Sequence, residues 1–469
     1  MSIKCSKKSL VLSLIWMLAL IFVSMESRMF ATGMMPVVIA WFIFNVLCSL
    51  FPLTIQMSLP LIVIRVTGFA RYVLLPIAMK NECISLSSYY GNSIVIIMIV
   101  ELIATYLGVL LFVYKKPLNW KYKKHIKMNS IVNQKIGLSA MIILILGSIF
   151  IMINRAYIER YFSISASKTI LSDVSGIVEL VVSCFFLLIF IIVLNFVKNI
   201  PVKNNSIKVI LSIISSVFYI NGSSVTGANV SRWSMLIAAI VAFVYILKFY
   251  PSYKKQLVVL LIAVFIFAVT IGTVIKFGEN GNSNYTTVNR AMEEQFSYDS
   301  INAYFSGPKN IEVSLRLNED IHNKHISKIK VIWSDIFANF PFLNKYLSNP
   351  SNQLTLLFNY KYYNSLIATD QIIPFSGQLY IYFGVLFIFV ELIFVYYAMK
   401  LYFKIGESND FLKIYCLIYL TFSLSLTNCI SFSVMLQNTW IHVLPVSLIY
   451  LFNINLRKKN ARKKDFLAV

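Results

Sequence analysis

The chain has 469 residues, of which 58% are hydrophobic and 13% are charged, and its formal net charge is +23. So few polar side chains cannot cover a water-soluble globule of this size, so the composition excludes that class and predicts an all-α polytopic integral membrane protein. In a soluble protein the charge would indicate nucleic acid, but cytoplasmic loops of membrane proteins gather lysine and arginine. We therefore expect membrane lipid as a partner and no nucleic acid.

Apolar segments long enough to cross roughly 30 Å of hydrocarbon recur about twelve times along the chain. We expect membrane spans near residues 9–25, 30–51, 60–78, 92–114, 137–154, 173–197, 207–221, 231–249, 256–275, 376–402, 411–430 and 434–453. The third contains Arg65 and Arg71 and the seventh is short, so either could be re-entrant. The start of the chain has the layout of a signal peptide without a small-residue cleavage site, which favours an uncleaved first helix.

The spans divide the chain into four parts. Residues 1–276 hold nine spans, 277–374 form one large loop, 375–455 hold three more spans, and 456–469 form a basic tail. If the N-terminus is cytoplasmic, 25 of the 42 basic residues fall in inside segments, whereas the large loop carries 8 basic and 9 acidic residues. This asymmetry follows the positive-inside rule and predicts cytoplasmic termini with an exported loop.

The 98-residue loop 277–374 is the one long polar stretch, and its mixed charges and seven tyrosines favour a folded domain over a disordered tether. Apolar residues recur at near-helical spacing between charged ones, which predicts an amphipathic helix at the membrane interface. They are Ile321, Ile326, Ile329, Trp333, Ile336, Phe337 and Phe340. The tract 349–370 is rich in Asn, Ser and Tyr, and suits either sugar binding or contact with lipid.

Charges at membrane depth are costly and often functional. Besides the arginines, these are Glu101, Glu179, Glu391 and His442. Arg232 follows a polar turn at the outer end of a span, where its guanidinium could grip a phosphate or simply snorkel to lipid. Arg65 and Arg71 could bind a ligand, or could pair with Glu101 or Glu179.

His322 and His325 are spaced so that they could share one helix face, and either could act as a general base. No third ligand stands at a recognisable spacing for a metal, and the six cysteines are scattered, so we expect no metal site, disulfide or zinc centre. Arg290 and Arg316 are further loop arginines that could hold a diphosphate. No nucleotide, dinucleotide or hydrolase motif occurs, and we expect no cofactor.

Two segments are similar to those of O-antigen polymerases of the Wzy type. One is Gly222 to Lys248, with a polar turn, Ser231, Arg232 and a long apolar run; the other, Pro374 to Gly384, contains Gln378 and Tyr380 before an apolar run. The layout of about twelve spans with one large exported loop extends the likeness along the chain. The repeats described for some of these polymerases, with glycine eleven positions after arginine, are absent.

The resemblance implies a GT-C-like inner-membrane glycosyltransferase that joins undecaprenyl-diphosphate-linked oligosaccharide repeat units on the periplasmic face. Arg232 with Arg65, Arg71 or Arg290 would stabilise the leaving diphosphate, and His322, His325, Glu293 or Asp299 would serve as base. A chain-length regulator and a flippase would be partners by resemblance. The alternatives are the related O-antigen ligase and, from another class, a flippase or other transporter, against which the long loop counts.

Overall fold

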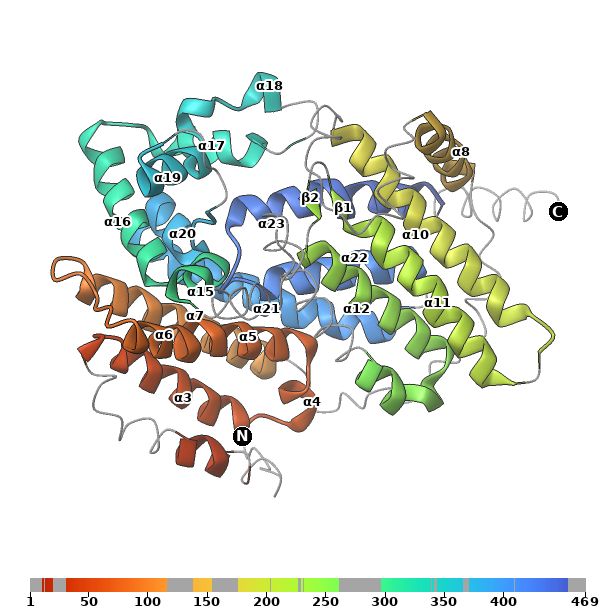
Figure 1. Ribbon diagram of the computed structural model, residues 1–469, viewed down its shortest axis with the longest axis horizontal. Coiled ribbons are helices and arrows are strands. Elements are labelled where there is room, and N and C mark those ends of the chain that lie inside the picture. Colours follow the sequence, from red (N-terminus) through yellow and green to blue (C-terminus); the bar gives the residue numbers. More distant parts are fainter. Residues whose placement is uncertain are drawn as a thin grey trace, which may run out of the picture. The chain divides into compact units, whose positions relative to one another are not determined.

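The computed structural model of the chain describes residues 11, 13–19, 31–115, 138–153, 176–202, 204–226, 229–230, 232–260, 297–338, 340, 344–365, 371–408 and 410–453. Within these ranges the chain is helical apart from a two-residue hairpin. It divides into two compact units, described separately below (Figure 1). Unit 1 comprises 1–120, 293–403 and 420–437; unit 2 comprises 121–292, 404–419 and 438–469.

Unit 1 begins with apolar helices from the first quarter of the chain. They are α3 (Met35–Ser49), the short α4 (Leu53–Gln56), α5 (Leu59–Phe69), the π-helical turn η1 (Ala70–Leu74), α6 (Leu75–Asn81) and α7 (Gly91–Lys115). Helix α3 packs on α7 and on η1. Segment α5–η1–α6 is one continuous helix, so the third predicted span is not re-entrant even though it carries Arg65 and Arg71.

The described part of the large loop in unit 1 is folded into helices. They are α15 (Tyr298–Phe305), α16 (Pro308–Asn323), α17 (Lys328–Ala338), α18 (Asn344–Leu347), the 3-10 turn η4 (Pro350–Asn352) and α19 (Leu354–Tyr363). Helices α16 and α17 pack on α20 (Phe375–Phe383), and α15 packs on α6 (Figure 1, teal against blue and orange). The turn after α6 also holds the loop, because Glu82 accepts from the Tyr298 amide and Tyr90 donates to Glu319.

After α20 come the 3-10 turn η5 (Gly384–Leu386), α21 (Phe387–Glu407), α22 (Phe411–Ser425) and α23 (Phe432–Asn438). The last three are divided between the two units. Two glycines allow close helix crossings inside unit 1: a Cβ on Gly108 would lie 2.8 Å from the Leu392 carbonyl, and one on Gly377 would lie 2.6 Å from the Ser314 hydroxyl. Small residues at such crossings are typical of membrane helices, where packing rather than burial of apolar surface drives association.

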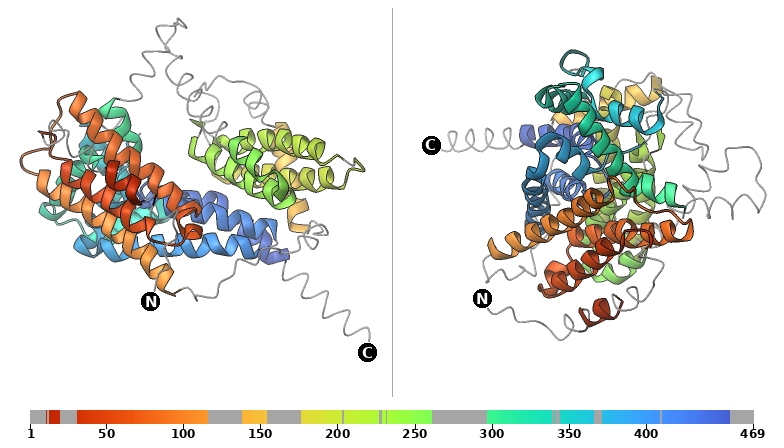
Figure 2. Two further views of the ribbon diagram at one scale, coloured as in Figure 1. Left: turned by 90° about the horizontal axis from the view of Figure 1, so that it is seen from below. Right: turned by 90° about the vertical axis from the view of Figure 1, so that its left-hand side faces the viewer.

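Unit 2 is a bundle built around α8 (Leu138–Ile153), α10 (Gly176–Asn199), α11 (Asn205–Ser224) and α12 (Arg232–Phe249), which ends in the turn η3 (Pro251–Tyr253) (Figure 2, yellow to green). A hairpin of β1 (Val225–Thr226) and β2 (Asn229–Val230) joins α11 to α12. Stacked aromatic rings fill its core, with Phe190 between Tyr219 and Tyr245. The π-helical turn η6 (Thr439–Val443) packs against α10.

Among the described residues, six helices are long and apolar enough to cross a membrane and four shorter apolar ones accompany them. The structure is therefore compatible with a membrane protein, as the composition predicted. The seventh predicted span is longer than expected, since α11 has 20 residues. The ninth, 256–275, lies largely outside the described residues, and the count of twelve stays a prediction.

The predicted single amphipathic helix from Ile321 to Phe340 is wrong, because the chain breaks between α16 and α17. The Ile326 amide donates to the Ile321 carbonyl and the His325 amide to that of His322, while His325 has a φ of 51°. This is a Schellman cap, in which a left-handed residue and a following apolar residue close the helix end. Helix α17 alone keeps the expected character: Ile329 and Trp333 are exposed, whereas Val331 is buried.

Candidate functional site: two buried polar clusters in unit 1

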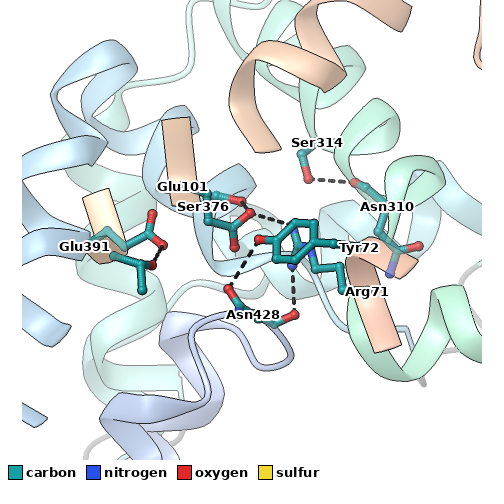
Figure 3. A network of polar contacts seen from close by, with 9 residues as sticks. Arg71, Tyr72, Glu101, Asn310, Ser314, Ser376, Glu391 and Asn428 are labelled. Carbon is teal, nitrogen blue, oxygen red and sulfur yellow. Dashed lines mark hydrogen bonds and ion pairs between the residues drawn. The ribbon is translucent and has the colours of Figure 1, made fainter. Parts of the chain in front are cut away.

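The first cluster, called here the Arg71 cluster, consists of Arg71, Tyr72, Glu101, Ser376 and Asn428 (Figure 3). Arg71 Nη2 lies 2.9 Å from Glu101 Oε2, and both side chains are fully buried. Arg71 Nη1 donates to the Asn428 carbonyl at 2.8 Å, and the Tyr72 hydroxyl donates to Asn428 Oδ1 at 3.4 Å. Ser376 donates to the same Glu101 oxygen at 3.4 Å. A buried ion pair persists only with such additional hydrogen bonds, so these neutral groups help to keep it.

The π-helical turn η1 places Arg71 and Tyr72 toward this cluster. The Leu75 amide bonds five residues back to the Ala70 carbonyl. Pro76 follows, and a proline has no amide hydrogen for the carbonyl four residues earlier and crowds it, so the turn before it widens. Wide turns of this kind are frequent at functional sites.

Asn428 lies on a buried, non-helical segment between α22 and α23. Residues 426–431 are all buried, and the described segment turns within the polar interior rather than on the surface. Irregular backbone at membrane depth is tolerated where protein covers it. Here part of its hydrogen-bonding capacity is met by Arg71, which takes the Asn428 carbonyl.

A second carboxyl, Glu391 on α21, extends the Arg71 cluster. Its Oε1 accepts from the Thr105 hydroxyl at 3.4 Å, and the side chain is fully buried. Glu391 interacts electrostatically with both Glu101 and Arg71. The cluster thus holds two carboxyls and one guanidinium, drawn from three different apolar helices (Figure 3).

The second cluster, called here the Asp335 cluster, joins the loop to α20. Asp335 on α17 accepts from the Leu354 amide at 2.8 Å, from the Tyr382 hydroxyl, and from Gln378 Nε2 at 3.4 Å. Gln378 Nε2 also lies 2.7 Å from the Ser433 hydroxyl. Asp335 is buried, and these contacts tie α17, α19, α20 and α23 together.

Burial raises the pKa of the Asp335 carboxyl to about 6, while the hydrogen bonds from Tyr382, Leu354 and Gln378 hold it lower than burial alone would. Desolvation penalises the charged form, and no cation in this cluster offsets it. A carboxyl that titrates near 6 can both take and give a proton close to neutral pH, which is what general acid–base chemistry needs.

One helix, α20, contributes to both clusters. Ser376 bonds to Glu101 in the first, and Gln378 and Tyr382 bond to Asp335 in the second. The start of α20 is in turn fixed to the loop, because Asn359 on α19 bonds to both the amide and the carbonyl of Gln371. The segment from Pro374 to Gly384 that carries the family resemblance is thus the connection between the loop and the buried polar groups.

Two of the predicted binding residues lie in these clusters. Arg71 is in the first, where the alternative of an ion pair with Glu101 is the one observed, and Gln378 is in the second. Tyr380 is half-buried on α20, with its ring near that of Phe387. Arg65 is half-buried, and its Nε and Nη2 have no hydrogen-bond partner within the described ranges.

The predicted loop residues are not brought together. Arg316 is half exposed and pairs with Glu312 one turn away on α16. His322 lies in the last turn of α16 and His325 in the cap beyond it, both exposed, so they do not share a helix face as expected, because the cap ends the helix between them. Asp299 pairs with Lys309 on the surface.

Arg232 is the first residue of α12, directly after the hairpin of β1 and β2, in unit 2. Its side chain lies outside the described residues, as do Glu179's side chain and the whole of Arg290 and Glu293. His442, also in unit 2, is buried on η6, where Nδ1 lies 2.9 Å from the Ser183 hydroxyl and the ring stacks on Tyr419. In the described parts of the chain no group of three potential metal ligands occurs.

Sequence reasoning missed Asp335, Tyr382, Asn428 and Ser433. Asp335 is a single acid on the buried side of an amphipathic helix, flanked by Val331, and that position is the signal that could have been read. The others are common polar residues in apolar segments, and only the fold shows that they meet. Comparisons with protein-family models, curated proteins and solved structures found no match for the chain.

Proposed function

We propose that this protein polymerises undecaprenyl-diphosphate-linked oligosaccharide repeat units at the outer face of a bacterial inner membrane. The observation that carries the proposal is the Asp335 cluster: a buried carboxyl with a pKa of about 6, on a loop helix, bonded to Gln378 and Tyr382 of the segment that resembles polymerases. Loop and resembling segment are thus one structural site.

The reaction breaks the bond between a donor sugar and its lipid diphosphate and forms a bond from an acceptor hydroxyl to the same sugar carbon. The hydroxyl proton needs a base, and Asp335 suits that role better than His322 or His325, which are exposed and lie apart from the polar clusters. Asp335 is buried, so we expect the acceptor to reach it only when α17 moves from α20. The leaving diphosphate needs positive charge, for which Arg232 at the start of α12 remains the proposed residue.

Deletion of the gene followed by electrophoresis of the surface polysaccharide tests this function. A polymerase predicts loss of the ladder with one repeat unit retained. Polymer left on its lipid carrier would instead indicate a ligase, and accumulation of unexported units would indicate a flippase.

Complementation of the deletion strain then tests the residues. We expect Asp335→Asn and Arg232→Ala to leave only single units, and Arg232→Lys to give a reduced ladder because it keeps the charge but loses the bidentate fork. Arg316→Ala, an exposed loop arginine, is the matched control and should restore the ladder. Each variant is compared at equal amounts in the membrane; a full ladder with Asp335→Asn would remove its proposed role.

The proposed orientation has the loop outside and the termini with the 115–135 segment inside. Alkaline phosphatase, which is active only after export, should be active when fused after Asn310 and inactive after Lys124. The reverse pattern would place the loop, and with it the Asp335 cluster, on the wrong side for an exported substrate.

A lipid-linked oligosaccharide transporter is the second candidate, and the Arg71 cluster favours it. Ionisable groups buried in apolar helices commonly mark substrate or proton pathways in transporters. Accumulation of unexported units in the deletion strain would support this candidate over the first.

A further inference from the structure

The Arg71 cluster contains three ionisable side chains that are completely buried: Arg71, Glu101 and Glu391. Each lies near the middle of a different helix that is long and apolar enough to cross a membrane. A charged group at that depth is costly unless it is paired or neutralised. The balance of charge among these three side chains therefore has to be accounted for.

The single guanidinium is committed to one carboxyl. Arg71 Nη2 pairs with Glu101 Oε2, and Nη1 donates to the Asn428 carbonyl. Glu391 receives only the long hydrogen bond from the Thr105 hydroxyl. Two ionised carboxylates beside one arginine would leave a net negative charge in a dry interior.

The hydrogen-bonding pattern independently points to a bound ligand. Glu391 Oε2 and Glu101 Oε1 are buried without a hydrogen-bond partner in the described part of the chain. A protonated carboxyl has an O–H to donate, and an ionised one does not. One proton on the glutamates would therefore supply a donor where acceptors alone now stand.

The groups around the two glutamates offer no other positive charge. Those that act on Glu391 are Glu101, Arg71 and the Thr105 hydroxyl. Those that act on Glu101 are Arg71, Tyr72 and Ser376, and the Cys429 thiol lies close enough to interact with Arg71 and Glu101. Tyr72, Cys429, Ser376 and Thr105 are neutral under ordinary conditions.

We propose that Glu391, with Glu101 as its neighbour, forms an intramembrane binding site for one hydrogen ion, while Arg71 keeps Glu101 ionised. The bound proton makes the cluster electrically neutral and lies on Glu391. The site is separate from the Asp335 cluster, and it does not depend on the polymerase function. A protein with such a site can couple a movement of α21 against α7 to uptake or release of a proton.

Infrared spectroscopy of the purified full-length protein tests the site, because a protonated carboxyl has its own C=O stretching band. Measured well above the pKa of Asp335, at neutral to mildly alkaline pH, the wild-type protein should show this band, and it should shift on exchange into D₂O. Glu391→Gln should abolish the band and accumulate at the wild-type level, because a neutral amide replaces a neutral acid. Asp335→Asn is the matched control and should keep the band.

Three outcomes would overturn the proposal. The band could survive Glu391→Gln, which would place the proton elsewhere. Glu391→Gln could fail to accumulate, which would mean that the ionised form of Glu391 is needed. The wild-type band could be present in potassium buffer and lost in sodium buffer, which would make the ligand a sodium ion.

Discussion

The Arg71 cluster and the Asp335 cluster of unit 1 both bury carboxyls, but only the first provides a cation. Glu101 has an arginine 2.9 Å away, whereas Asp335 is held by a tyrosine, a glutamine and one backbone amide. The first arrangement maintains a charge pair in an apolar interior, while the second lets the carboxyl change its charge near pH 6. The contrast shows how one polar helix, α20, can support both a fixed charge and a titrating one.

Removing the cation should have the largest effect on this comparison. Arg71→Gln leaves Glu101 buried beside Glu391 with no counter-charge, and breaking a buried pair costs about 3 to 5 kcal/mol. We expect little folded protein by size-exclusion chromatography in detergent. The double variant Arg71→Gln with Glu101→Gln removes both charges and should recover part of the folded fraction; if it were no better than the single variant, the ion pair would not be the cause.

The Asp335 cluster should impose a pH dependence on stability. The carboxyl pKa is raised from 3.8 to about 6 on folding, so the folded state holds the proton more tightly. The stability that this proton contributes is fully present below about pH 4 and is lost as the pH rises through 6, a total of about 3 kcal/mol. Asp335→Asn cannot lose a proton, so thermal unfolding should favour the variant increasingly over wild type between pH 4 and 6. A constant difference across that range would contradict the assigned pKa.

A smaller effect is expected where the loop is fastened to α20. Asn359→Ala removes the hydrogen bonds to the Gln371 amide and carbonyl and to the Thr355 carbonyl, at about 1 to 3 kcal/mol for the unsatisfied groups left behind. We expect faster proteolysis within 344–365 while α7 and α21 stay protected. Asn359→Asp keeps the acceptor for the Gln371 amide and should lose less.

The smallest effect should come from the surface pair of Arg316 and Glu312. Exposed ion pairs contribute between 0 and about 1 kcal/mol, so Arg316→Ala should unfold within a degree or two of wild type. A large loss of stability would mean that Arg316 acts through its contact with the Tyr90 ring instead.

Hydropathy and charge predicted the helical class and the position of the large polar loop, because burial of apolar surface dominates over the long apolar segments. The loop's internal structure was harder to predict: the spacing from Ile321 to Phe340 continues across a helix break that only a left-handed residue at His325 reveals. Periodicity alone cannot show that Ile326 serves the cap of α16 and not the face of α17.

The ionisable residues Arg71, Glu101 and Glu391 were recognisable as unusual, but their partners were not. A local signal was present, since both π-helical turns end at a Leu-Pro pair, Leu75–Pro76 and Leu444–Pro445, and each carries a buried ionisable residue, Arg71 and His442. Asn428 and Ser433 gave no signal because contacts between residues hundreds of positions apart depend on the fold.

Reconstitution tests the central claim most directly. The purified protein is placed in liposomes with an undecaprenyl-diphosphate-linked repeat unit, and products are separated by electrophoresis, with Asp335→Asn in parallel at equal folded amounts. The account predicts a ladder of polymer for the wild-type protein and single units for the variant. Single units from both proteins, with the substrate moved across the bilayer, would contradict polymerisation and favour transport; equal ladders from both would remove Asp335 from the reaction.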